Sequence, residues 1–201
     1  VSENMTRLAL DSIALCAFDY RFNSFYQNEM HPFIGAMLRT LAEAGARTRR
    51  LPLHNRLLFM AQRQFNEDVQ LIHGIGRKVI EERKRCPQPE TKDLLNLMLE
   101  GRDPLTGVGL SEQNILFQLV PFLIAGHETT SGLLSFTLYE LLKNPEALRK
   151  AQQEVDEVLG GERPRFEDMS RLSYIDQCLK ESLRLWPIAP LIAIYPREDT
   201  L

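Results

Sequence analysis

Residues Leu123 to Phe136 read LIAGHETTSGLLSF and hold the most informative polar groups of the chain. A histidine, a glutamate and two threonines lie there inside a long apolar run. Buried polar side chains cost free energy unless they have hydrogen-bond partners. The stretch therefore indicates either a close helix crossing that satisfies these groups internally or a site that uses them.

A zinc site is one interpretation of His127 and Glu128. A His-Glu pair followed by a second histidine one helical turn later is a metalloprotease signature. Here Ser131 stands where the second histidine belongs. Because two histidines then cannot share the helix face, the sequence does not support a zinc site at this place.

The spacing of the small residues favours a different site. Ala125 and Gly126 have almost no side chain, and Thr129 follows three to four residues later, so the three share one helix face. This predicts a shallow groove with a hydroxyl beside it. Thr129 can bond back to a backbone carbonyl or to a guest, and Glu128 can pass protons if water reaches it. A close helix crossing would suit the same residues equally well.

A second polar group lies in CLKESLRLWP, Cys178 to Pro187. Glu181 and Arg184 stand three residues apart near the end of a predicted helix, on one of its faces. Such a pair is usually a weak surface ion pair. Flanking leucines and Trp186 leave the alternative of a buried pair open, and such a pair would need further partners to offset its desolvation.

Helical periodicity predicts a mainly α chain. The apolar run IAPLIAIYPRED after Pro187 would suit one short strand. Two of the helices are so apolar that they need cover on nearly all sides, so we expect the 201 residues to be the middle of a larger fold. The helices are predicted at Met5–Phe18, about 33–51, about 55–85 with a weak point at Gly74 and Gly76, Asp93–Gly101, Ser111–Leu142, 145–160 with Asn144 as N-cap, and Tyr174–Trp186.

Composition excludes some classes of protein. A net charge of -3 gives no reason to expect a nucleic-acid partner. Three cysteines without paired spacing indicate a reducing, cytoplasmic setting. The longest nearly apolar run, Ile115 to Gly126, is too short for a transmembrane anchor.

The two polar motifs together carry a family resemblance. A-G-x-E-T-T on a long helix, followed by E-x-x-R in a later helix that ends in RLWP, resembles the cytochrome P-450 superfamily of haem-thiolate monooxygenases. LALDSIALCAFDYRFNSFYQNEMHPF, FLIAGHETTSGLLSF and ESLRLWPIAP are similar to bacterial and fungal fatty-acid hydroxylases fused to a diflavin reductase. The resemblance implies a central fragment of the P-450 fold, about helices E to K, with residues 1–201 forming part of a haem-monooxygenase domain. The domain's N-terminal part, its haem-ligand region and any reductase domain would lie outside.

The resemblance also implies roles for single residues. Thr129 would hydrogen-bond the bound oxygen species, and Glu128 would belong to the proton relay. Glu181 and Arg184 would organise the structure near the proximal side of the haem. Ala125, Gly126, Thr129 and Thr130 would contact the cofactor, while Phe33, Met37, Ile124, Ala189 and Leu191 would line the substrate pocket, with ordinary core packing as the alternative for these five.

The implied chemistry is insertion of one oxygen atom of O2 into a fatty acid or similar apolar substrate. The cofactors would be haem b and, through a fused or separate diflavin reductase, FAD, FMN and NADPH. The segment F-x-x-G-x-R-x-C-x-G that carries the iron ligand is absent, and Cys16, Cys86 and Cys178 lack its neighbours. We therefore assign no metal ligand to this chain and expect it to be inactive in isolation.

Two alternatives stay open from the sequence. One is a non-enzymatic helical interaction module, which would bind no cofactor. The other is a haem-thiolate isomerase or dehydratase that does not activate O2, although Thr129 and Glu128 count against it.

Pro121 is unexpected in the central helix, because it leaves the carbonyl of Phe117 without its backbone donor. It should therefore kink the helix one turn before the groove.

Overall fold

The computed structural model describes residues 1–50 and 58–190, and these residues are mainly helical, as predicted. Within them the only β-type pairing is a single bridge between Arg102 and Gly109. None of the helices in this part of the chain is long and apolar enough to cross a membrane. The elements are α1 (Ser2–Phe18), η1 (Ser24–Tyr26), α2 (Pro32–Arg47), α4 (Phe59–Arg85), α5 (Leu94–Glu100), α6 (Glu112–Lys143), α7 (Pro145–Leu159), η2 (Phe166–Arg171) and α8 (Ser173–Leu185).

The chain divides into two compact units, which are described separately. The large unit is Thr6–Glu128, and the small unit combines Val1–Met5 with Thr129–Leu201. Helices α1 and α6 both run across this division. The predicted strand near the C-terminus lies beyond residue 190, outside the described residues.

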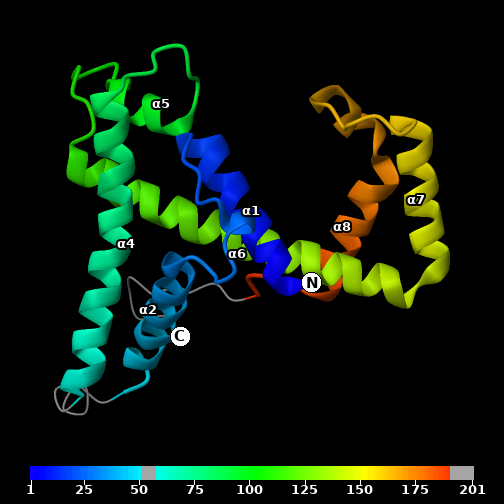
Figure 1. Ribbon diagram of the computed structural model, residues 1–201, viewed down its shortest axis with the longest axis horizontal. Helices are drawn as coiled ribbons and strands as arrows, with labels where there is room; N and C mark the ends of the chain where they lie inside the picture. The colour runs from blue at the N-terminus through cyan, green and yellow to red at the C-terminus, as the bar shows by residue number, and fades with distance from the viewer. Residues whose placement is uncertain (51–57, 191–201) are drawn as a thin grey trace, which may run out of the picture. The chain divides into compact units, whose positions relative to one another are not determined.

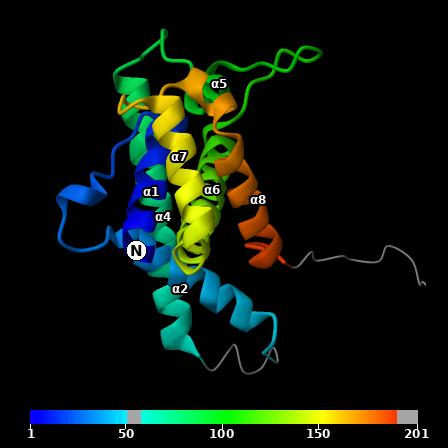
Figure 2. The same cartoon turned by 90° about the vertical axis from the view of Figure 1, so that its right-hand side faces the viewer.

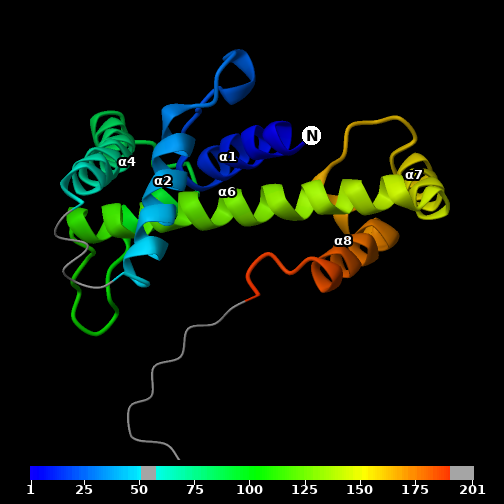
Figure 3. The ribbon, with the colours of Figure 1, turned by 90° about the horizontal axis from the view of Figure 1, so that it is seen from below.

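The large unit has one apolar core. Helix α2 packs along α4, and α1 crosses α6 near its middle, where Ile13 meets Gly126 (Figures 1 and 3). Helices α1, α2, α4, α5 and α6 each contribute buried apolar side chains, and removing such surface from water is the main stabilising term for a unit of this kind. Core side chains include Leu10, Ala14, Phe18, Phe33, Met37, Ile72, Ile80, Leu95, Leu116, Leu119 and Leu123.

The predicted weak point in α4 is wrong, because the helix is unbroken from Phe59 to Arg85. The two glycines have different surroundings. A Cβ on Gly76 would lie 2.5 Å from Cδ1 of Leu116 in α6, whereas a Cβ on Gly74 would meet nothing within 4 Å. Gly76 therefore stands at a close approach of α4 and α6, and packing outweighs its low helix propensity.

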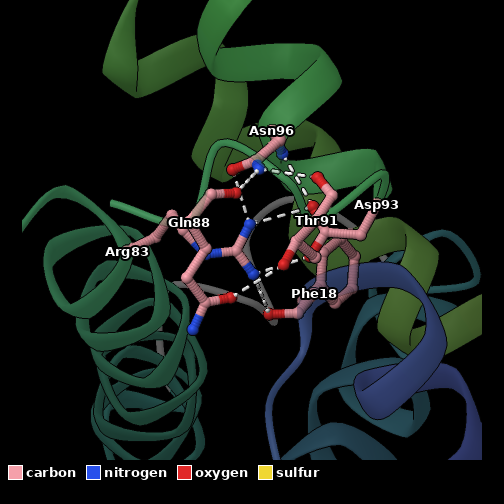
Figure 4. A network of polar contacts seen from close by, with 6 residues as sticks. All are labelled: Phe18, Arg83, Gln88, Thr91, Asp93 and Asn96. Carbon is pink, nitrogen blue, oxygen red and sulfur yellow. Dashed lines mark hydrogen bonds and ion pairs between the residues drawn. The ribbon is translucent and has the colours of Figure 1, made fainter. Parts of the chain in front are cut away.

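A buried arginine joins three helix ends in the large unit (Figure 4). Arg83 of α4 donates to both carboxylate oxygens of Asp93, at 2.9 and 2.6 Å, and to the carbonyl of Phe18 at 3.2 Å. The carboxylate of Asp93 also caps α5 by accepting the backbone N–H of Asn96 at 2.9 Å. One ion pair thus fixes the ends of α1, α4 and α5 against one another.

Asn96 completes this network with its side-chain amide (Figure 4). Its Oδ1 accepts from Arg83 at 2.6 Å, and its Nδ2 donates to the carbonyls of Gln88 and Thr91 at 2.6 and 2.7 Å. The short connection between α4 and α5 is therefore held by hydrogen bonds at several points.

In the small unit, α7 and α8 lie side by side (Figure 2). Glu154 of α7 accepts the backbone N–H groups of Tyr174 and Ile175, at 2.7 and 2.9 Å, and the hydroxyl of Ser173 at 3.1 Å. Desolvation raises the pKa of Glu154, but these donors outweigh it and leave the pKa below its ordinary value. Glu154 thus supplies the N-terminal cap of α8 from a neighbouring helix.

Ser111 and Gly160 cap their helices, whereas Asn144, which was predicted as an N-cap, does not. Ser111 accepts the backbone N–H of Asn114 at 3.2 Å, and Gly160 ends α7 in a left-handed conformation, with φ 56°. Asn144 does not cap α7 with its side chain. Its amide instead donates to the carbonyl of Glu140 at 2.8 Å, so it closes the end of α6.

Candidate functional site

Helix α6 has one buried and one exposed face along the stretch that holds the polar motif. Residues that recur every three or four positions share a face of a helix. The buried side is formed by Leu116, Leu119, Leu123 and His127. The opposite side, which we name the exposed stripe, is formed by Gln118, Pro121, Phe122, Ala125, Glu128 and Thr129.

The space predicted to form a groove over Ala125 and Gly126 is occupied on the Gly126 side. Ala125 and Thr129 share the exposed stripe, as the spacing predicted. Gly126 lies at the edge of the stripe and is half-buried. A Cβ on Gly126 would lie 2.8 Å from Cγ1 and 3.0 Å from Cδ1 of Ile13, a residue of α1. The space that Gly126 leaves is therefore filled by Ile13, and only the Ala125 side is open.

His127 belongs to the packed face of α6, with 2% of its surface exposed. Desolvation lowers its pKa, opposed by the backbone carbonyl of Ile124, so the imidazole is neutral near pH 7. No group of three or more histidine, cysteine, aspartate or glutamate side chains occurs in the described part of the chain with the proximity needed to hold a metal ion. A neutral, buried imidazole acts here as a packing residue.

The other polar residues of the motif are accessible. Glu128, Thr129 and Thr130 are exposed, and each could therefore meet a ligand. Pro121 lies on the same stripe, and α6 continues through it without interruption. The kink expected at Pro121 stays a prediction.

The Glu181–Arg184 pair is exposed, and burial of this pair is therefore not observed. The two side chains form a bidentate ion pair at 2.7 and 2.8 Å, with 56% and 67% of their surfaces exposed. The hydrogen bond lowers the pKa of Glu181 and raises that of Arg184. The neighbouring apolar side chains of Leu183, Leu185 and Trp186 are also 41–45% exposed, so the described residues leave this ion pair uncovered.

The C-terminal end of α8 is anchored on α6 within the small unit. The ring of Trp186 stacks on Phe136, with centroids 4.9 Å apart and planes inclined by 4°. Its Nε1 donates to Glu140 at 3.0 Å. Ile188, which follows α8 in the chain, packs over Gly132 of α6. These contacts fix where α8 presents Glu181 and Arg184. They join residues far apart in sequence, and only the aromatic character of Trp186 signals them.

A hollow of about 590 Å³ lies between α6, α7 and α8 in the small unit. Glu181 and Cys178 are among its lining residues. Desolvation raises the pKa of the Cys178 thiol, and the nearby charge of Glu154 adds to the effect. The thiol is therefore protonated near pH 7 and a poor nucleophile.

The five candidate substrate residues have different settings. Phe33 and Met37 are fully buried in the core of the large unit, which fits the core-packing alternative. Ile124 is half-buried against that core, and Ala189 is exposed. Leu191 lies outside the described residues. Of these five, only Ile124 lies next to the exposed stripe in the described large unit.

Comparison with known proteins identifies the family. The profile of the family described as Cytochrome P450 matches residues 1–200. The chain is 49% identical over its whole length to bifunctional cytochrome P450/NADPH–P450 reductase 2 of Bacillus subtilis and 50% identical to the corresponding protein of Bacillus cereus. It is 48% identical, over 98% of its length, to a self-sufficient cytochrome P450 monooxygenase of Aspergillus terreus.

In each case the chain spans 19% of the relative's length. A P450 implies haem as cofactor, and an NADPH–P450 reductase implies FAD, FMN and NADPH. The family match covers nearly all of the chain and agrees with the two motifs on α6 and α8. This chain belongs to the cytochrome P450 family.

Proposed function

We propose that the full-length protein is a haem-thiolate monooxygenase that inserts one oxygen atom of O2 into a fatty acid or a similar apolar substrate. Electrons would come from NADPH through the flavins of a reductase. The observation that carries the proposal is the exposed stripe of α6, where the small Ala125 stands one turn before the hydroxyl of Thr129. It occurs in a chain whose relatives combine a P450 with an NADPH–P450 reductase.

The residues of the stripe fit one face of a flat cofactor. Ala125 adds only a methyl group to the exposed side of α6, and the backbone of Gly126 lies beside it, so a planar group can come close. The exposed hydroxyls of Thr129 and Thr130 follow on the next turn. When bound, a haem with a thiolate ligand supplies the activation of O2 and favours O–O cleavage.

Thr129 and Glu128 would control protons at this face. A threonine hydroxyl donates one hydrogen bond and accepts others, so Thr129 can hold a proton at Oγ and pass it to a ligand. Glu128 is exposed on the same stripe, and its carboxylate can exchange protons with water. The proposed order of transfer is from solvent to Glu128 and then, through water, to Thr129.

Apolar side chains beside Ala125 would hold the substrate. Phe122 is 41% exposed on the stripe, and Ile124 is half-buried at its edge. An alkyl chain laid on these side chains would remove apolar surface from water, which is the usual source of affinity for such ligands. Phe33 and Met37 would act indirectly, by supporting the core below.

Glu181 and Arg184 would bind another segment of the fold near the proximal side of the cofactor. An exposed ion pair adds little to the stability of its own helix. Bidentate geometry, however, suits a site that receives further hydrogen bonds. The anchoring of α8 through Trp186 would hold the pair in position for this contact.

The test uses the full-length protein with NADPH, a saturated fatty acid and 18O2. We expect one 18O atom in the hydroxylated product, detected by mass spectrometry. Thr129→Ala should lower the product formed per NADPH by about tenfold or more and raise peroxide, because the proton donor is lost. Thr129→Ser keeps the hydroxyl and should retain most of the coupling.

Three results would contradict the proposal. The first is a product without 18O, which would point to an isomerase or dehydratase. The second is a protein that binds no haem, as expected of a helical interaction module. The third is a Thr129→Ala variant that couples NADPH to product as well as Thr129→Ser does.

A further inference from the structure

We propose that Ile13 of α1 is a positioning residue for the turn of α6 that presents Ala125. Its side chain fills the space over Gly126, at the edge of the exposed stripe. The contact itself rests on the structure alone. Its effect on turnover rests on the proposed monooxygenase function.

The contact at Gly126 leaves no room for a larger residue. An added Cβ would lie 2.8, 3.0 and 3.5 Å from Cγ1, Cδ1 and Cβ of Ile13. Ile13 is β-branched, so its χ1 angle is restricted in a helix and its Cγ1 cannot swing aside. Relief would therefore require α1 and α6 to move apart.

The surrounding core opposes such a movement. Leu10 and Ala14, one turn before and one residue after Ile13, are fully buried, and Leu123 of α6 is 2% exposed. All three belong to the core of the large unit. Separating the helices at Gly126 would open this core, and packed interiors resist such displacements.

Ala125 would follow any shift of Gly126, because the two residues are adjacent in one helical turn. Ala125 and Glu128 lie on the exposed stripe, and Ile13 contacts the same turn at the edge of the stripe. Catalysis is sensitive to such shifts, since misplacement by about 1 Å can cost about 100-fold in rate. Ile13 would thus set how far the stripe projects toward a bound cofactor.

Gly76 provides a matched control. It too is a helix glycine closed by a side chain, Leu116 of α6, at 2.5 Å from an added Cβ. Leu116 belongs to the buried face, more than two turns before Ala125. Gly76→Ala should therefore disturb packing without moving the turn at Ala125, whereas Gly126→Ala should do both.

The experiment compares Gly126→Ala, Ile13→Ala, the double variant and Gly76→Ala in the full-length, haem-loaded protein. We expect Gly126→Ala to lower product per NADPH by about tenfold, and the double variant to regain most of it, because removing Cγ1 and Cδ1 makes room for the new methyl group. Gly76→Ala should lower the denaturation midpoint yet retain coupling. If the double variant couples no better than Gly126→Ala, or if Gly76→Ala uncouples equally, the positioning role is wrong.

Denaturation midpoints give a readout that does not depend on turnover. If the two residues are in contact, the midpoint shift of the double variant differs from the sum of the shifts of Gly126→Ala and Ile13→Ala. Additive shifts would overturn the proposal, even if the wild-type protein forms no product. Non-additive shifts without any turnover would refute the monooxygenase function and keep the contact. If Gly126→Ala does not fold, Ile13→Ala alone decides: unchanged coupling would contradict the positioning role.

Discussion

The Arg83–Asp93 and Arg184–Glu181 pairs have almost the same geometry in opposite settings. Both are bidentate, with hydrogen bonds of 2.6–2.9 Å. The side chains of the first pair are each 5% exposed, whereas those of the second are 67% and 56% exposed. The first pair is surrounded by further partners, and the second stands on the open side of α8.

The difference shows that setting, rather than geometry, decides what an ion pair does. A buried pair becomes costly to break, because removing one partner leaves an uncompensated charge in the interior. An exposed pair is screened by water and salt and adds little to folding. Arg83 and Asp93 therefore organise the large unit, while Glu181 and Arg184 are available to bind another segment.

The largest expected effect is that of Arg83→Ala. Removing the guanidinium leaves the carboxylate of Asp93 buried without its cation, and the free energy of unfolding should fall by about 3–5 kcal/mol. Denaturant titration of the purified protein measures this loss. A loss of the size seen for a surface substitution would show that the network in Figure 4 does not hold the helix ends together.

The same pair predicts a pH dependence. Desolvation raises the pKa of Asp93, but the hydrogen bonds from Arg83 and from the backbone N–H of Asn96 outweigh it, so the pKa in the folded protein lies below the ordinary 3.8. The stabilisation is therefore complete above about pH 4 and is lost as pH falls through the lower, folded value. Asp93→Asn keeps the helix cap and should remove this part of the dependence. Identical acid titration curves for both proteins would contradict the assignment.

Two glycines of α4 allow the same comparison between a packed position and an open one. Gly76→Ala places a methyl group against Leu116 and should destabilise the protein by about 1–3 kcal/mol. Gly74→Ala meets open space and should stabilise it by about 0.5–1 kcal/mol through higher helix propensity. Thermal melts of the two variants should shift in opposite directions, and shifts of the same sign would show that the close approach of α4 and α6 is absent.

The smallest effect on folding is expected for Arg184→Ala. More than half of each side chain of its ion pair is exposed, so the free energy of unfolding of this chain should change by no more than the error of a denaturant titration. In the full-length protein, where the pair is proposed to bind another segment, haem incorporation should fall. Strong destabilisation of the isolated chain would instead place the pair in a structural role within α8.

The sequence predicted most helices because their apolar spacing and caps are local features. Asp93 and Ser111 start helices where polar side chains precede apolar runs, and both accept a backbone N–H of the first turn. The A-G-x-E-T-T spacing likewise predicted that Ala125 and Thr129 share a face. The family could also be predicted, because each of the two motifs is a short stretch of consecutive residues.

Contacts between distant residues could not be predicted in the same way. Nothing near Gly126 in the sequence indicates that Ile13 occupies the space beside its Cα. Nothing near Arg83 indicates that its side chain is buried. The sequence could not decide between an exposed and a buried setting of Glu181 and Arg184 for a related reason. Apolar neighbours indicate that a face can be covered, but only the arrangement of other segments determines whether it is.

The most direct test of the proposed site measures the accessibility of the exposed stripe. A cysteine introduced by Ala125→Cys is alkylated in the full-length protein with and without haem, and the modified peptide is quantified by mass spectrometry. Leu97→Cys, in an exposed position of α5, reports any general change in folding. We predict that haem protects the cysteine at position 125 and leaves the one at position 97 unchanged. Equal alkylation of position 125 in both states, with haem bound, would contradict the proposal that the stripe faces the cofactor.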